Sequence, residues 1–339
     1  MTPDCQPTLK RSALVMLALA AALIVPLAAK AQAPKVRIGY NINLGNSPAP
    51  VAAERGIFRK HGVDADVKVF ASGPALTQAM ATKQVDLAYV GFLPAYGWLE
   101  REVPTVAIAQ SSYGLGSIVV RADSGITSLA DLRGKSIAGS RKGSGNDAIL
   151  RILLLRELAK LEPDRDVQVV GMGEEGKGEA LLEKKVDAAF LVEPFTTQVL
   201  ATERAKLLVN TVDAAPRHPW YLIVARTDWV KEHRDLAVKV VRAHVEAVKL
   251  LNAGEAADSI ARIFNLAPVT GASGKVTSPA DLVRMAKERV GFDYELSERE
   301  MEFFDRQVVW SRTLGFSKGA QKARDLFDPT VLRDALNAR

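Results

Sequence analysis

Three places in the chain join a loop to a predicted helix start and carry residues suited to anion binding. A helix N-terminus offers free backbone N–H groups and about half a positive charge, so it can replace water around a sulfonate, nitrate or carboxylate. Glycine at such a junction lets the backbone approach the ligand closely. The alternative is that these residues only cap their helices. The candidates are Asn43, Asn46, Ser47, Ser72, Gly73, Ser144, Gly145 and Asn146.

A carboxylate follows a predicted strand, and several aromatic residues lie at loop or hinge positions. Glu193 lies in the sequence Val-Glu-Pro-Phe, directly after an apolar run. We predict that it holds an ammonium or another donor of the ligand; the alternative is an acid that locks its loop through backbone N–H groups. The remaining candidates could form the wall of an organic-ligand site, or pack in the core. They are Gly91, Phe92, Tyr113, Trp220 and Tyr221.

Patterns that would indicate other chemistry fail on their context. Residues 171–176 match the dinucleotide-binding glycine pattern, but Glu174 and Glu175 would face a pyrophosphate with like charge. The Gly-Lys-Ser at 134–136 precedes a strand, whereas a phosphate-binding loop needs a helix there. The four histidines show no metal-ligand spacing, and no Gly-x-Ser-x-Gly motif accompanies them. We therefore expect no catalytic residue, metal or cofactor.

The elements that position these residues follow from a stretch that occurs twice. Residues 83–90 and 184–191 each pass from a helical run through Val-Asp into a short apolar strand, and each strand leads to a loop with a proline. Such apolar runs suit strands buried on both faces of a parallel sheet. Ligands bind at the carboxyl ends of such strands in open α/β sheets. Two copies predict two lobes with a ligand between them.

A second pair of similar segments predicts how the lobes are joined. Ser117–Asp123 and Tyr221–Asp228 are nearly alike, and we expect them to be two hinge strands after a crossing within 111–116. The predicted lobes are 34–116 and 117–223, with 224–339 returning to the first lobe. Helices are expected near 236–251, 256–264, 279–290 and 298–314, and a surface loop over 269–278.

The N-terminus has the pattern of a signal peptide. Lys10 and Arg11 precede an apolar run over 13–29, and Ala31-Gln32-Ala33 is a small-residue cleavage signal, so we expect export and cleavage after Ala33. The apolar run is also long enough for an uncleaved anchor. The only cysteine is Cys5. Cleavage would therefore exclude thiol nucleophiles, disulfides and thiolate metal sites from the mature chain.

Composition is consistent with a globular two-domain protein. The chain has 339 residues, of which 48% are hydrophobic and 25% charged. Its formal charge of +6 comes from basic residues interleaved with acids. We therefore expect no nucleic-acid partner.

This arrangement resembles the periplasmic substrate-binding proteins of ABC importers, in the nitrate, sulfonate and taurine branch. The most specific match is Thr127–Ala138, which is similar to the family's lead into the second lobe. The two repeated stretches depart from the family's pattern at one position. A glycine commonly precedes Val-Asp in the family, whereas this chain has Gln84 and Lys185. The resemblance implies an α/β, two-lobed type II fold in which each lobe is a mixed, mainly parallel sheet flanked by helices.

The resemblance implies a monomeric periplasmic receptor that delivers a small anionic or zwitterionic ligand to an ABC permease and its ATPase. A sulfonate or taurine-like ligand is the first expectation; nitrate or a thiamin-pyrimidine precursor is the alternative. An enzyme of pyrimidine synthesis with the same fold is a further alternative, and a receptor that feeds a sensor is another. The absence of cysteine after Ala33 argues against the enzyme.

Overall fold

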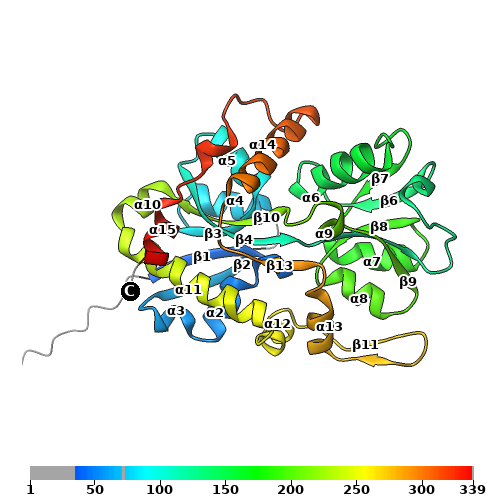
Figure 1. The fold of residues 1–339 in the computed structure, drawn as a ribbon, viewed down its shortest axis with the longest axis horizontal. Helices are drawn as coiled ribbons and strands as arrows, with labels where there is room; N and C mark the ends of the chain where they lie inside the picture. Colours follow the sequence, from blue (N-terminus) through cyan, green and yellow to red (C-terminus); the bar gives the residue numbers. More distant parts are fainter. Residues whose placement is uncertain (1–34, 71–72, 338–339) are drawn as a thin grey trace, which may run out of the picture. The chain divides into compact units, whose positions relative to one another are not determined.

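The structure is a computed structural model that describes residues 35–70 and 73–337. The predicted signal peptide and Ser72 lie outside the described residues. Two sheets flanked by helices form the α/β fold that the sequence predicts (Figure 1). The first sheet has six strands in the order β13-β4-β10-β3-β1-β2. Its strands are β1 (Lys35–Asn41), β2 (Asp64–Phe70), β3 (Leu87–Gly91), β4 (Thr105–Gly114), β10 (Pro219–Arg226) and β13 (Val290–Phe292).

The second sheet repeats the order of the first around a different set of strands. Its order is β7-β6-β8-β5-β9. Each sheet contains three strands that pair in parallel, in the order β2-β1-β3 in the first and β7-β6-β8 in the second. An antiparallel strand lies next to this trio in each sheet: β10 beside β3, and β5 beside β8. The strands are β5 (Gly116–Arg121), β6 (Ser136–Gly139), β7 (Gln168–Gly171), β8 (Ala188–Val192) and β9 (Ala205–Asn210). We call each sheet with its helices a lobe.

The two predicted hinge strands are these antiparallel strands, β5 and β10. Each lies within one sheet and does not run between the lobes, so the hinge prediction needs correction. The chain crosses between the sheets at Leu115, and it returns through 211–218. The second sheet therefore spans Gly116–Asn210, whereas the predicted boundary at 223 falls inside β10 of the first sheet. The similar sequences of β5 and β10 mark equivalent strands within the two sheets, and both strands are buried.

Helices cover both lobes, and several follow the expected patterns. A capping serine and a proline in the first turn begin α13 (Pro279–Ala286), where the Ser278 hydroxyl accepts a hydrogen bond from the backbone N–H of Asp281. Gly254 ends α11 in the left-handed conformation that favours glycine. The first-lobe helices are α2 (Pro48–Glu54), α3 (Ile57–Lys60), α4 (Gly73–Ala81), α5 (Phe92–Glu100), α10 (Thr227–Glu232), α11 (Arg234–Ala253), α14 (Glu298–Thr313) and α15 (Thr330–Asn337).

The second lobe carries its own helices. The predicted helix from Asn146 begins as α6 and continues as the π-helical segment η4. The elements are η3 (Leu129–Leu132), α6 (Gly145–Ala148), η4 (Ile149–Ala159), α7 (Glu174–Leu182), α8 (Phe195–Ala201) and α9 (Thr211–Ala214).

The C-terminal region does not return wholly to the first lobe, which corrects a second expectation. Helix α13 packs against α8 of the second lobe, and the predicted surface loop contains a hairpin that also reaches α8. By contrast, α11 and α15 pack together on the first lobe. The elements of this region are α12 (Ala257–Ile263), β11 (Val269–Thr270), β12 (Val276–Thr277), α13 (Pro279–Ala286) and η5 (Ala323–Leu326).

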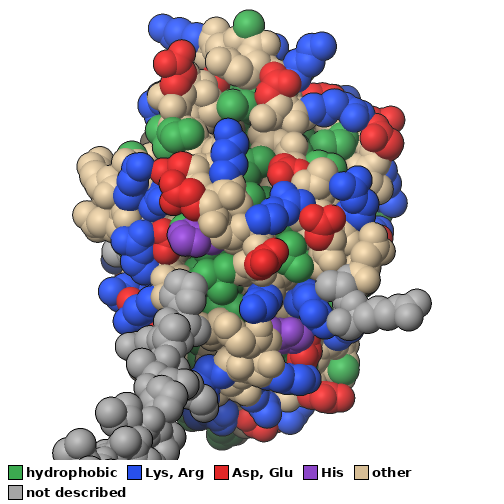
Figure 2. Space-filling view, turned by 90° about the vertical axis from the view of Figure 1, so that its left-hand side faces the viewer, with side chains coloured by type: hydrophobic (Ala, Val, Ile, Leu, Met, Phe, Trp, Pro, Cys, Tyr) green, Lys and Arg blue, Asp and Glu red, His purple; other side chains and the backbone are tan. Residues whose placement is uncertain are grey.

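The strands of the repeated stretch lie in the core, as expected. All residues of β8 and the first four of β3 are buried. Around the core, charge is mixed: Figure 2 shows basic and acidic side chains interspersed on one face. None of the helices within 35–70 and 73–337 is both long and apolar enough to cross a bilayer.

Candidate functional site

A cavity of about 640 Å³ lies between the two lobes. Its walls come from the segments that follow the carboxyl ends of β1, β2 and β3 on one side, and of β6, β7 and β8 on the other. The beginning of β10 completes the wall, because this antiparallel strand starts at the same edge of its sheet. Both sheets therefore offer the edge at which open α/β sheets bind ligands.

Eight of the predicted site residues meet in this cavity, although they come from distant parts of the sequence. The loop after β1, the end of β3, the start of α6 and the start of β10 bring them together. They are Asn43, Gly91, Phe92, Ser144, Gly145, Asn146, Trp220 and Tyr221.

Asn46, Ser47 and Tyr113 are not part of the cavity lining that the described residues form. Asn46 and Ser47 are fully buried at the end of the segment that joins β1 to α2. The ring of Tyr113 lies under the guanidinium of Arg217, with 4.9 Å between Cζ and the ring centroid. Gly73 begins α4, and Ser72 is outside the described residues. The predicted helix start at Ser144 lines the cavity with all three of its candidate residues, and the predicted start near Ser47 contributes Asn43.

The helix start at Ser144 is already partly neutralised. The Ser144 hydroxyl accepts a hydrogen bond from the backbone N–H of Asp147 at 3.1 Å, as a cap does. The carboxylate of Asp147 is fully buried in the first turn and pairs with Arg151 at 2.8 Å. Burial raises the pKa of Asp147, although Arg151 opposes that shift. An acid in the first turn offsets the positive end of the helix, so this terminus alone is a weak anion site.

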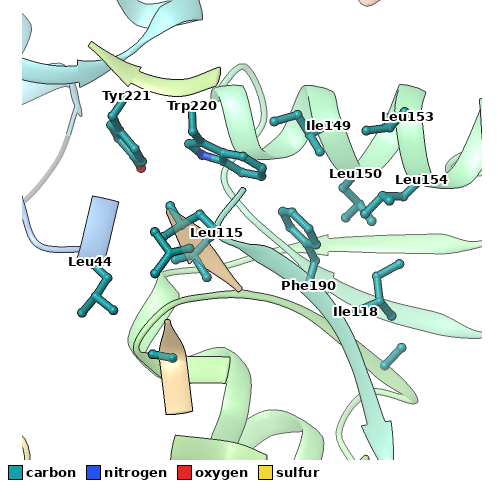
Figure 3. Packing of buried hydrophobic residues seen from close by; sticks show 14 of the residues in the cluster. Leu44, Leu115, Ile118, Ile149, Leu150, Leu153, Leu154, Phe190, Trp220 and Tyr221 are labelled. Atoms are coloured by element: carbon teal, nitrogen blue, oxygen red, sulfur yellow. The ribbon is translucent and has the colours of Figure 1, made fainter. Parts of the chain in front are cut away.

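A hydrogen-bond chain crosses the cavity from one lobe to the other. The indole Nε1 of Trp220 donates to Oδ1 of Asn146 at 2.9 Å, which joins β10 to α6. The Nδ2 of Asn146 then donates to Oε1 of Glu174 at 3.4 Å. Figure 3 shows Trp220 beside Phe190 and Ile149 of the second lobe. These contacts fix the indole ring as part of the cavity wall.

Glu174 is held from behind by a buried lysine. The Nζ of Lys177 is 2.8 Å from Oε2 of Glu174, and it also donates to Oγ of Ser140 at 2.7 Å. Ser140 in turn donates to Oε1 of Glu174 at 2.6 Å. Lys177 is fully buried, and burial lowers its pKa although Glu174 opposes the shift. The cavity therefore meets a carboxylate whose charge is largely compensated by the protein.

Sequence reasoning did not select Arg141, Glu174 or Lys177 as site residues. Arg141 and Glu174 line the cavity, and Lys177 supports Glu174. The available signal was topological: Arg141 follows β6 and Glu174 follows β7, as the chosen residues follow their strands. Lys177 carried no such signal, because its burial depends on how α7 packs over β8.

Glu193 occupies a different position from the one predicted for a ligand contact. Its carboxylate is fully buried, accepts a hydrogen bond from Nε of Arg289 at 2.6 Å, and accepts another from the backbone N–H of Thr197 at 3.2 Å. Complete burial raises the pKa of Glu193, and Arg289 opposes that shift. Glu193 is outside the cavity lining that the described residues form. This geometry favours the alternative role, an acid that locks its loop.

The Glu193–Arg289 pair lies where the segments that join the lobes meet. The backbone N–H of Leu115 donates to the carbonyl of Arg289 at 2.7 Å, and that of Glu193 donates to the carbonyl of Leu115 at 3.2 Å. The backbone N–H of Leu44 donates to the carbonyl of Glu193 at 3.0 Å. We call Leu44, Leu115, Glu193 and Arg289 the hinge node.

Glycine is required on both sides of Leu115. Gly114 has φ +73°, and a Cβ there would lie 2.5 Å from Val212. A Cβ on Gly116 would lie 2.6 Å from the ring of Phe190 and 2.9 Å from that of Trp220. The crossing thus places the backbone directly against the indole that lines the cavity.

Among the described residues, no group of three or more His, Cys, Asp or Glu side chains is arranged to hold a metal ion. The ionisable side chains of the lining are Arg141, Glu174, Glu175 and Tyr221. Burial raises the pKa of the Tyr221 hydroxyl, so it stays protonated at neutral pH.

Curated relatives match most of the chain. A "Putative binding protein" of Brucella abortus (strain 2308) is 29% identical over 290 residues, which cover 83% of this chain and 88% of the relative. A "Putative aliphatic sulfonates-binding protein" of Bacillus subtilis (strain 168) is 27% identical over 293 residues, covering 82% and 86%.

Solved structures of binding proteins share the fold. The aliphatic sulphonate binding protein SsuA of Escherichia coli has a TM-score of 0.73 at 17% identity, covering 87% of this chain and 92% of SsuA. The nitrate-binding protein NrtA of Synechocystis PCC 6803 has a TM-score of 0.72 at 14% identity, covering 89% and 88%.

An enzyme also shares the fold, which shows that the architecture alone does not decide between binding and catalysis. The desulfurization enzyme DSZB has a TM-score of 0.62 at 18% identity, covering 89% of this chain and 99% of that chain. Membership of a family rests on sequence instead: the NMT1-like family model matches residues 29–265, so the chain belongs to the NMT1-like family.

Proposed function

We propose that this chain is a periplasmic, monomeric solute-binding receptor that captures a small organic anion between its lobes and delivers it to an ABC importer. The observation that carries the proposal is the cavity of about 640 Å³ whose walls come from strand ends of both sheets. A ligand held by both walls at once stabilises the closed arrangement, and only such differential contact can shift a conformational equilibrium. The names of the relatives from Brucella and Bacillus, and of SsuA and NrtA, support a binding role.

Binding without catalysis is part of this proposal. The carboxylate of Glu174 is occupied by Ser140, Asn146 and Lys177, which leaves it little freedom to act as a general base. DSZB is the reason to test for an enzyme as well. The enzyme alternative is tested by incubating the protein with aryl sulfinates and analysing the solution for released sulfite. Catalytic release of sulfite would contradict the proposal that the protein binds its ligand without catalysis.

A ligand screen tests the receptor directly. Purified protein is heated with sulfonates, carboxylates, nitrate and taurine, and the hits are examined by small-angle scattering. A ligand at 100 times its Kd adds about 2.7 kcal/mol of stability. We expect at least one anion or zwitterion to raise the melting temperature and to reduce the radius of gyration. If none does either, the proposal fails.

A blocked cavity provides the control. A Cβ on Gly145 would meet nothing within 4 Å, so Gly145→Leu projects into the open cavity without a clash. We expect this variant to melt like the parent without ligand and to lose the ligand-induced shift. Gly176 lies on the exposed side of α7, also with nothing within 4 Å, and Gly176→Leu should keep the shift.

A further inference from the structure

The cleft continues beyond the cavity into a second space. This outer chamber has a volume of about 620 Å³ and shares Arg141, Asn146 and Glu174 with the inner cavity. Its walls again come from both lobes: Thr77, Gln78 and Arg101 from the first, and residues 140–144 from the second. A ligand in the cleft can therefore extend from one space into the other.

The outer chamber carries uncompensated positive charge. Its charged lining residues are Arg101, Arg141, Lys142 and Glu174. The oxygens of Glu174 already accept hydrogen bonds from Ser140, Asn146 and Lys177. Within 35–70 and 73–337, no ion pair neutralises Arg101, Arg141 or Lys142, whereas most other arginines of this part are paired. Clefts lined by one sign of charge concentrate ligands of the opposite sign.

The inner cavity is of a different kind. Its walls are mostly apolar, with the aromatic side chains of Phe70, Phe195, Trp220 and Tyr221 from both lobes. Its volume falls within the roughly 300–1,000 Å³ typical of sites for drug-sized molecules. Nitrate and taurine are far smaller: nitrate has no apolar surface, and taurine offers these rings only two methylene groups.

We propose that the ligand is an organic anion with a flat, unsaturated body. Its body lies among the aromatic residues of the inner cavity, and its sulfonate or carboxylate group lies in the outer chamber against Arg141, with Arg101 and Lys142 nearby. This inference rests on the proposed receptor function and narrows its substrate class. Arg141 is the specificity-determining residue, because it borders both spaces. An arginine fork matches the planar or tetrahedral oxygens of such anions.

Calorimetry with four sodium salts tests the substrate class: 1-naphthalenesulfonate, benzenesulfonate, methanesulfonate and nitrate. 1-Naphthalenemethanol is the uncharged probe. We expect the aryl sulfonates to bind at least tenfold more tightly than methanesulfonate or nitrate, and the alcohol to bind at least tenfold more weakly than naphthalenesulfonate. The affinity should also fall as salt rises, since the cations are exposed.

Two variants test the outer chamber and the inner cavity separately. Arg141→Gln should weaken naphthalenesulfonate at least tenfold. Phe195→Ala should weaken naphthalenesulfonate while it leaves the weak binding of methanesulfonate unchanged. Arg59 is the matched control: it is exposed, it has no ion pair within the described residues, and it lies on α3 away from the cleft. Arg59→Gln should bind like the parent.

Different results would contradict the proposed receptor function and the proposed substrate class. If methanesulfonate, taurine or nitrate binds as tightly as the aryl sulfonates, the substrate class is wrong and the receptor function stands. If aryl sulfonates bind and Arg141→Gln leaves their affinity unchanged, the assignment of the anionic group to the outer chamber is wrong. If no anion or zwitterion binds at all, both proposals fail.

Discussion

Two aspartates show how the repeated stretch works at the level of single residues. Asp86 and Asp187 directly precede β3 and β8, and each exchanges two hydrogen bonds with the backbone of the neighbouring parallel strand. The N–H of Asp86 donates to the carbonyl of Arg37 at 2.8 Å, and its carboxylate accepts the Arg37 N–H at 2.9 Å. Asp187 makes the same pair of bonds with Ser136, at 3.0 and 2.9 Å. The Val-Asp pattern is therefore a structural signature of strand pairing.

Single residues also mark the limit of sequence reasoning. A position in the loop after a buried strand predicted both the cavity residue Phe92 and the hinge residue Glu193. What separates them is the partner: Arg289 lies 96 residues away in sequence and fills the space beside the Glu193 carboxylate. No local pattern encodes such a long-range contact. The aromatic candidates divide in the same way, since Trp220 lines the cavity and Tyr113 does not.

The first prediction concerns the Glu193–Arg289 pair. Removing one partner of a buried ion pair leaves an uncompensated charge, at a cost of about 3–5 kcal/mol. We expect Glu193→Gln to lower the free energy of unfolding by an amount in that range, measured in urea, with ligand affinity changed less than tenfold. The double variant Glu193→Gln/Arg289→Gln should cost less than the sum of the single variants. A large loss of affinity at unchanged stability would instead place Glu193 at the ligand.

At the scale of elements, sequence predicted the strands well because their apolar runs are short, buried and bounded by turn residues. It also found that β5 and β10 are related. It could not show that each is inserted antiparallel into a sheet, since the pairing of a strand is decided by neighbours distant in sequence. The hairpin β11–β12 was missed for a different reason: strands of two residues are too short to show alternation.

The helices before the two aspartates end in the same way, and this gives a second prediction. Lys83 and Lys184 have φ of 59° and 64°. The N–H of Gln84 donates to the carbonyl of Ala79, and that of Lys185 to Ala180, which is the bond pattern of a helix end that favours glycine. The left-handed conformation costs a non-glycine residue roughly 1–2 kcal/mol. Glycine avoids this cost, but it loses more conformational entropy on folding than alanine does, and this loss offsets about half of its advantage.

We therefore expect Lys83→Gly and Lys184→Gly each to unfold with about 0.5–1 kcal/mol more stability than the matching alanine variants. The alanine variants are the control, because they remove the exposed ion pairs to Asp228 and Asp123 and keep the Cβ. Such surface pairs contribute little. Equal stability of the glycine and alanine variants in thermal unfolding would show that the helix ends relax away from the left-handed conformation.

At the scale of the whole molecule, three segments pass between the lobes: the crossing at Leu115, the return through 211–218, and the C-terminal connection through α13 and Arg289. The first and the third meet at the hinge node. The crossing at Leu115 lies inside the segment 111–116 that the sequence predicted. The third connection, through α13 and Arg289, could not be predicted, because amphipathic helices of the C-terminal region fit either lobe by their pattern alone. The sequence thus predicts two lobes and the edges that face each other, while the hinge depends on packing.

The return segment 211–218 contains a fully buried histidine. His218 is fully buried beside Trp220, with 5.3 Å between the ring centroids, and it stacks on Phe303 of α14. Within the described residues, neither of its ring nitrogens has a hydrogen-bond partner. Burial, with Arg306 as a smaller cause, lowers the pKa of His218 well below its ordinary value of 6.5. Burial also lowers the pKa of His244 to about 4.

Two histidines with lowered pKa values make the folded protein sensitive to acid. Below about pH 6.5 the unfolded chain binds protons at both positions and the folded chain does not, so stability is complete above that pH and falls toward pH 4. A shift of the His244 pKa from 6.5 to about 4 corresponds to about 3 kcal/mol of stability.

We expect His218→Phe to melt no lower than the parent at pH 7, since it removes two unpartnered nitrogens, and to lose less stability between pH 7 and pH 5. His233→Gln, at an exposed position, should keep the parent's pH dependence in the same calorimetric series. A parent-like slope for His218→Phe would mean that the His218 ring gains a proton or a partner in the folded state, and the acid sensitivity would then belong to His244 and the carboxylates.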